Sequence, residues 1–125
     1  MFNTLVYKIM FFIVATAAML YPVMPNDFVS SLFPENLNDK VQHATVFFIL
    51  AWLLNRSSDT KKHRIRNIIV LSIFGIVIEL IQYYVPNRTP SVYDALADIV
   101  GILLFQFLYT VYLQLSKEKS YYSKP

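Results

Sequence analysis

The chain has 125 residues, of which 56% are hydrophobic and 15% are charged, and this apolar share exceeds that of a typical soluble domain. Its formal net charge of +3 is too small to indicate a nucleic-acid partner, and the lack of cysteine excludes a disulfide, a thiolate zinc site and a cysteine nucleophile. We therefore predict a membrane protein that does not bind nucleic acid.

The first apolar segment, about residues 5–24, is long enough to cross a membrane as a helix, since roughly 20 residues span a hydrocarbon layer of about 30 Å. A cleaved secretory signal is the alternative, because Lys8 precedes a short apolar core and Ala15-Thr16-Ala17 resembles a cleavage site. The apolar run continues past that tripeptide to Met24, which favours a retained helix.

The second predicted helix, about residues 39–55, has only a short apolar core, Val41 to Leu54. It approaches the length needed to span a membrane only if its polar start belongs to the helix, with that end in the membrane interface or in a protein cavity. The third and fourth predicted helices, about residues 66–85 and 93–115, are close to spanning length or longer. Residues 116–125 are polar, and we expect a loosely ordered tail there.

The lysine and arginine residues set the predicted orientation of these helices, because cytoplasmic segments of membrane proteins are enriched in them. They concentrate between the second and third helices and in the tail: Arg56, Lys61, Lys62, Arg64, Arg66, Lys117, Lys119 and Lys124. Both stretches are expected in the cytoplasm, and four helices then place the amino terminus there too. The prediction is an all-α, multi-pass protein of the cell membrane, in which residues 1–125 form a single domain. This domain is a four-helix transmembrane bundle with both termini cytoplasmic.

Polar side chains of three predicted helices then meet at the outer face of the membrane. The sets are Asp39, Lys40 and His43; Glu79 and Gln82; and Asp94 and Asp98, with Arg88 in the loop before the last helix. Spacings of three and four residues place each set on one side of its helix. A charge facing lipid is costly, so these sides should point into the bundle, where Gly75 and Gly101 would let the helices approach closely.

Most of these side chains also have a purely structural interpretation. The structural roles are helix capping for Asp39 and Asp94, a hydrogen-bonded core position for His43, interhelical bonding for Gln82 and interfacial anchoring for Arg88. Glu79 is harder to explain in this way, because a carboxylate roughly 10 Å deep in a membrane must be protonated, paired or hydrated.

The chain resembles the VanZ-like membrane proteins over roughly residues 39–105, in three blocks: Asp39-Lys40-x-x-His43, then Gly75-x-x-x-Glu79-x-x-Gln82, then Arg88 and Asp94-x-x-x-Asp98-x-x-Gly101. Where the family often has Asp-x-x-x-Asn in the last block, this chain has Asp98, an acid in place of an amide. The resemblance implies an integral membrane protein of the bacterial cell envelope that is linked to tolerance of the glycopeptide teicoplanin.

Together these residues lead us to expect an outward-facing site that binds or acts on a membrane lipid or a cell-wall precursor that bears phosphate. Lys40 and Arg88, with Gln82, would bind the ligand, since cations hold phosphate by charge-assisted hydrogen bonds. The candidate catalytic residues are Glu79, His43, Asp94, Asp98 and Asp39. The carboxylates could also hold a hard divalent cation, but the sequence has no named metal signature and specifies no cofactor.

Two alternatives stay open at this point. In the first, the same groups relay protons or ions in a small transporter subunit, which four helices could build only as an oligomer of identical chains. In the second, the polar groups specify how the helices pack, and the protein binds a lipid or a partner without catalysis.

Overall fold

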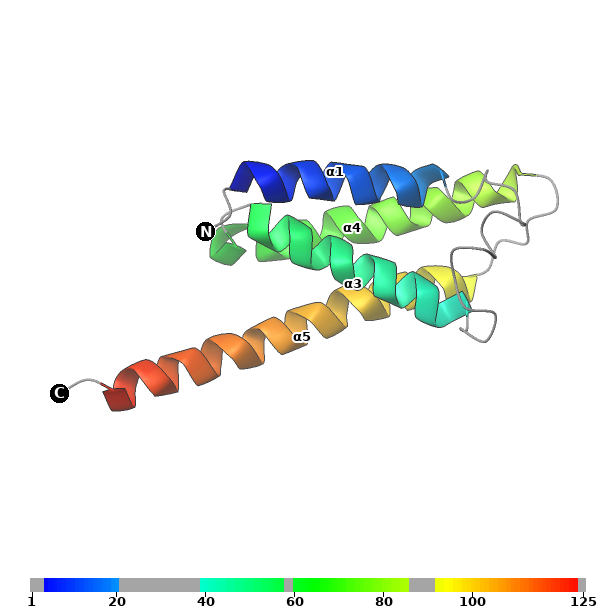
Figure 1. The fold of residues 1–125 in the computed structure, drawn as a ribbon. Coiled ribbons are helices and arrows are strands. Elements are labelled where there is room, and N and C mark those ends of the chain that lie inside the picture. The colour runs from blue at the N-terminus through cyan, green and yellow to red at the C-terminus, as the bar shows by residue number, and fades with distance from the viewer. Residues whose placement is uncertain (1–3, 21–38, 58–59, 86–91, 124–125) are drawn as a thin grey trace.

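A computed structural model of the chain describes residues 4–20, 39–57, 60–85 and 92–123 (Figure 1). It contains four helices in these ranges, α1 (Thr4–Leu20), α3 (Asp39–Ser57), α4 (Thr60–Tyr83) and α5 (Val92–Ser123). No strand occurs within the ranges described, so the predicted all-α class is confirmed for them.

The second predicted helix is confirmed together with its polar start. Helix α3 begins at Asp39 and contains Lys40 and His43 in its first turns, so the short apolar core is extended as the prediction required. Within the described ranges, α1 ends at Leu20, and the predicted continuation of the first helix to Met24 lies outside them.

Two of the predicted boundaries are wrong. The basic stretch between the second and third helices is mostly helical, because α3 includes Arg56 and α4 begins at Thr60; a non-helical residue, His63 (φ −114°, ψ 15°), interrupts α4 near its start. The tail is also ordered, since α5 continues to Ser123. Residues 116–123 contain no glycine or proline, and lysine and glutamate propagate a helix well.

Helix α3 occupies the centre of the bundle. It packs against α1, α4 and α5, and α4 also packs against the first half of α5 (Figure 1). The buried core between the helices is small: Phe47, Leu50, Ala51, Leu71, Ile78, Ile102 and Phe105. Between Phe107 and Lys119 no residue of α5 is buried, and this half of the helix diverges from the others in Figure 1.

Glycines hold two of the interhelical contacts close, as the sequence predicted. A Cβ atom at Gly101 would lie 2.9 Å from the carbonyl carbon of Ala44 and 3.0 Å from its Cα, so the backbones of α5 and α3 touch there. A Cβ at Gly75 would lie 2.9 Å from Oδ2 of Asp98. Because lipid tails are as apolar as leucine, such close contacts between small residues are a main source of helix association in membranes.

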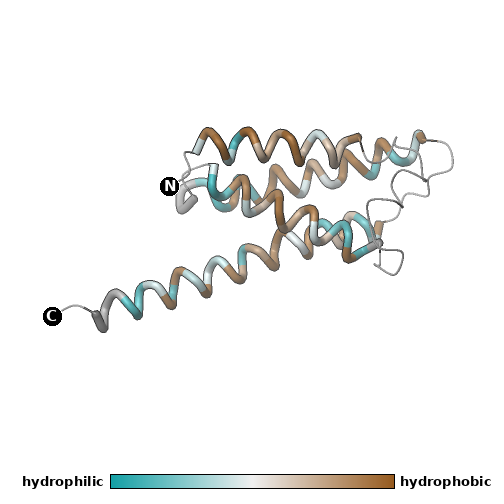
Figure 2. Tube along the Cα trace, viewed as in Figure 1, coloured by the Kyte–Doolittle hydropathy of each residue, from teal (hydrophilic) through white to brown (hydrophobic). Residues whose placement is uncertain are grey.

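The outer surface of the helices is strongly apolar. Helix α1 has no buried residue, and its exposed side chains include Phe12, Ile13 and Leu20. Most of the α1 trace is coloured as hydrophobic in Figure 2. Two segments, His63–Tyr83 with 21 residues and Val92–Lys119 with 28, are long and apolar enough to cross a membrane. Apolar surface this extensive is unusual for a soluble protein and is expected of helices that face lipid. That α1 and α3 also cross the membrane remains a prediction.

Candidate functional site

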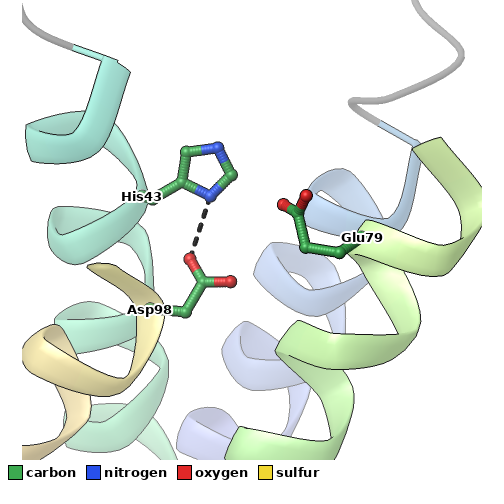
Figure 3. Close-up of side chains that lie close together, drawn as sticks. All are labelled: His43, Glu79 and Asp98. Carbon is green, nitrogen blue, oxygen red and sulfur yellow. Dashed lines mark hydrogen bonds and ion pairs between the residues drawn. The ribbon is translucent and has the colours of Figure 1, made fainter. Parts of the chain in front are cut away.

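Three ionisable side chains from three helices meet near one end of the bundle. His43 comes from α3, Glu79 from α4 and Asp98 from α5, and Figure 3 shows them directed toward a common space. One potential ligand atom from each residue lies within 4.8 Å of the other two. We call this group the three-helix cluster. It lies where α3 and α5 begin and α4 ends (Figure 1).

His43 lies between two carboxylates of α5. Its Nδ1 is 2.9 Å from Oδ1 of Asp98, and its Nε2 is 3.8 Å from Oδ2 of Asp94. The two aspartates are four residues apart, so they lie on one side of α5. All three side chains are nearly buried, with exposed fractions of 10% for His43, 6% for Asp94 and 1% for Asp98. When Nδ1–H donates to Asp98, Nε2 has the lone pair that can accept a proton or bind a metal.

Lys40 lies one turn before His43 on α3, at the rim of the site. Its Nζ donates a hydrogen bond to Oδ1 of Asp94 and forms an ion pair with it. The lysine side chain is 43% exposed, whereas the aspartate is buried, so this ion pair lies between the three-helix cluster and the surface of the bundle. The described side chains of the site therefore include three carboxyl groups and one ammonium group.

Glu79 completes the cluster from α4, and Gln82 follows it almost one turn later. Both residues are buried, with 9% of Glu79 and 5% of Gln82 exposed. Within the described residues, Oε1 of Glu79 and Oδ2 of Asp98 are buried oxygens with no hydrogen bond, although both residues take part in other interactions. A buried oxygen without a hydrogen bond is costly, and it marks a position where a further ligand would be stabilising.

The predicted site residues therefore fall into two groups. Contacts or close approach bring together Lys40, His43, Glu79, Asp94 and Asp98. Gln82 is buried at the same end of α4. Asp39 begins α3, but its side chain lies outside the described part, as does the whole of Arg88. Their predicted roles as catalytic and ligand-binding residues stay predictions.

A second polar group, which the sequence did not predict, joins α4 to the middle of α5. Nε of Arg64 donates to Oε1 of Gln106 at 2.7 Å, Nη2 donates to the Gln106 carbonyl oxygen at 2.8 Å, and Nη2 also contacts Oγ1 of Thr110. The interpretation of Arg64 as a loop residue and topology signal overlooked this packing role. The sequence signal for this role was the pair Gln106 and Thr110, two polar residues four positions apart in an apolar run, which require a polar partner.

A cavity of about 550 Å³ lies at the opposite end of the bundle from the three-helix cluster. Three basic side chains, Lys8, His63 and Arg66, line it together with Ser57, and Phe11, Phe12 and Leu54 form its apolar wall. These residues belong to the first half and middle of α1, the end of α3 and the start of α4. This basic cavity is thus separate from the three-helix cluster.

Comparison with models of known protein families identifies a relationship. The family model described as VanZ/LLP1 matches residues 4–113, a range that includes α1, α3, α4, most of α5 and the whole three-helix cluster. Neither the curated proteins nor the solved structures gave a match.

Proposed function

Since the chain belongs to the VanZ/LLP1 family, we propose that it acts in the bacterial cell envelope through the three-helix cluster. In this proposal the cluster opens on the outer face of the membrane and binds, or acts on, a phosphate-bearing lipid or cell-wall precursor. The consequence for the cell is tolerance of glycopeptides such as teicoplanin.

The family and the distribution of charge support the location in this proposal. Family membership and the two long apolar helices indicate a membrane protein. The basic residues Arg56, Arg64 and Arg66 and the lysines near the end of α5 lie toward one end of the bundle, and the cluster lies toward the other (Figure 1). The positive-inside rule supports a cytoplasmic position for the basic end, which puts the cluster on the outside of a multi-pass bundle.

The observation that supports a chemical role is the position of His43 between two buried carboxylates. A carboxylate bonded to one ring nitrogen fixes the orientation of an imidazole and leaves the other nitrogen ready to exchange a proton. Positioned proton transfer of this kind typically contributes about 10²- to 10⁴-fold to a reaction rate. The 43% exposure of Lys40 at the rim supports a ligand with an anionic group, because an ammonium group binds phosphate by charge-assisted hydrogen bonds.

A proton or ion relay through the bundle has less support. The fully buried side chains Leu50, Leu71 and Ile102 lie along their helices between the cluster and the Arg64–Gln106 group. Such an apolar layer interrupts a polar path across the described helices. A transport path would have to form between chains of an oligomer, whereas a ligand site at the outer end needs only the contacts described above.

The test is complementation of glycopeptide tolerance in a susceptible Gram-positive host. Expression of the wild-type chain should raise the inhibitory concentration of teicoplanin, and Glu79→Gln and His43→Ala should abolish the increase at normal protein levels. Glu118→Gln, an exposed carboxylate on α5, is the matched control and should behave as wild type. A wild-type chain that gives no increase, or variants that keep full tolerance, would contradict the proposal.

Native mass spectrometry of the same proteins separates a ligand site from a packing role. A phosphate-bearing lipid that accompanies the wild type and is lost from folded Glu79→Gln supports the ligand site. A variant with lowered expression and a lowered unfolding temperature, but with the same bound lipid, instead assigns Glu79 to helix packing and argues against the proposal.

A further inference from the structure

The donor atoms of the three-helix cluster match those of a metal site. Imidazole and carboxylate are the ligands of many zinc and manganese sites. Donors at about 2.1 Å from one ion lie about 3.4 Å apart in a tetrahedral site. The donors of His43, Glu79 and Asp98 lie within 4.8 Å of one another, so binding requires side-chain movements of at most about 1.4 Å. We infer that these three residues bind one divalent cation of the transition series, Zn²⁺ or Mn²⁺.

The charge of the cluster favours a cation. Two of the three potential ligands, Glu79 and Asp98, carry carboxyl groups, and the third, His43, lies against Asp98. Two carboxylates close together in an apolar bundle repel one another strongly, because the surroundings screen charge poorly. A dication between them compensates both charges, whereas a free phosphate group would add to the repulsion.

The orientation of the side chains also suits a metal. The two buried oxygens without a hydrogen bond among the described residues, Oε1 of Glu79 and Oδ2 of Asp98, belong to two of the proposed ligands. Oδ1 of Asp98 lies 2.9 Å from Nδ1 of His43, which is close to the separation of two donor atoms on one ion, about 3 Å at ligand distances of about 2.1 Å. Figure 3 shows the Glu79 carboxyl group facing this pair across the space between the helices.

Three protein ligands leave at least one coordination position open for water or for an oxygen atom of a ligand. A phosphate oxygen in that position would explain how an acidic site binds an anionic lipid or precursor. This role of the metal rests on the proposed function, whereas metal binding itself does not. When the ion is bound, His43 acts as its ligand and not as the proton carrier of the metal-free site.

Metal binding is tested on the purified full-length chain in detergent, after removal of metals with a chelator. ZnCl₂ is titrated in competition with a chromogenic zinc indicator, MnCl₂ binding is followed by electron paramagnetic resonance, and stoichiometry is read by native mass spectrometry. We expect one ion per wild-type chain. Glu79→Gln and Asp98→Asn, which preserve side-chain shape, should weaken binding at least about 10-fold, and the control Glu118→Gln should not.

Two results would overturn the inference: folded wild-type protein that binds neither ion stoichiometrically, or a folded Glu79→Gln variant with unchanged affinity. Circular dichroism identifies variants that fail to fold, and the wild-type titration remains decisive if all of them do. Unchanged teicoplanin tolerance in a variant that has lost the metal would contradict the proposed function alone. Tolerance that depends on Glu79 in a protein that binds no metal would contradict the metal site alone.

Discussion

Gly101 of α5 contacts the backbone of Ala44 on α3, directly beside the turn of α3 that contains His43 and the turn of α5 that contains Asp98. Ala44 follows His43 in the chain, and Gly101 lies three residues after Asp98. The close approach of these two small residues therefore sets the distance between α3 and α5 at the position where the 2.9 Å contact of His43 with Asp98 forms. The packing of the bundle and the geometry of the candidate site share one cause.

We predict that Gly101→Ala destabilises the protein and separates His43 from Asp98. The new methyl group would overlap the carbonyl group of Ala44, and a backbone group cannot turn away as a side chain can. Overpacking of this kind typically costs about 1–3 kcal/mol. Thermal unfolding in detergent measures the loss of stability.

Gly75→Ala is the matched comparison for this variant. The nearest atom to its added methyl is Oδ2 of Asp98, the end of a side chain that can shift, so we expect a smaller loss of stability than at Gly101. A Gly101→Ala protein as stable as wild type would show that the helices separate without cost, contrary to the role assigned to this contact.

A second prediction concerns the energetic coupling of His43 and Asp98. Interhelical polar pairs in membrane proteins contribute about 0.6 kcal/mol on average and up to about 1.7 kcal/mol, and this buried pair should lie in the upper part of that range. The measurement is a double-mutant cycle of His43→Ala and Asp98→Asn, followed by unfolding in detergent. His43→Ala combined with Glu118→Gln is the control, and its coupling should be near zero. Equal coupling in both cycles would remove the evidence for a specific pair.

The helices and the polar side of each one were predictable, because both depend on local spacing along the chain. Asp94 and Asp98, four residues apart, had to share one side of α5 in any helix. The partner of each carboxylate was not predictable, since the choice of Lys40 for Asp94 and His43 for Asp98 depends on how α3 and α5 are rotated against each other. That rotation follows from the Gly101–Ala44 contact, which involves residues distant in sequence.

The wrong predictions for Arg64 and for residues 116–123 have the same origin, because both relied on local sequence alone. Arg64 was interpreted from the local run of basic residues, whereas its actual partners, Gln106 and Thr110, lie on another helix. Residues 116–123 were predicted to form a loose tail because they are polar, but they form the end of α5. A long helix can continue into polar sequence when no glycine or proline ends it.

The third prediction is that Arg64→Lys does not replace arginine. The guanidinium group bonds the side chain and the carbonyl oxygen of Gln106 at the same time, and a lysine ammonium cannot reproduce that forked geometry. We expect both Arg64→Lys and Arg64→Ala to lower stability by about 1–3 kcal/mol, with the polar groups of α5 left unsatisfied. Arg66→Lys is the control, because Arg66 is exposed and its only bonds among the described residues go to neighbouring Asn67. A fully stable Arg64→Lys variant would contradict this role.

The fourth prediction concerns orientation, and the absence of native cysteine makes it directly testable. Tyr84, highly exposed just after α4, lies at the end of the bundle that holds the cluster, and Lys117 lies toward the other end of α5. In intact cells, a membrane-impermeant maleimide should label Tyr84→Cys and spare Lys117→Cys, and permeabilisation should make Lys117→Cys reactive. This outcome follows from the positive-inside rule, because the basic residues near α5's end favour the cytoplasm. The reverse labelling pattern would place the His43–Asp98 pair on the cytoplasmic side and contradict an outward-facing site.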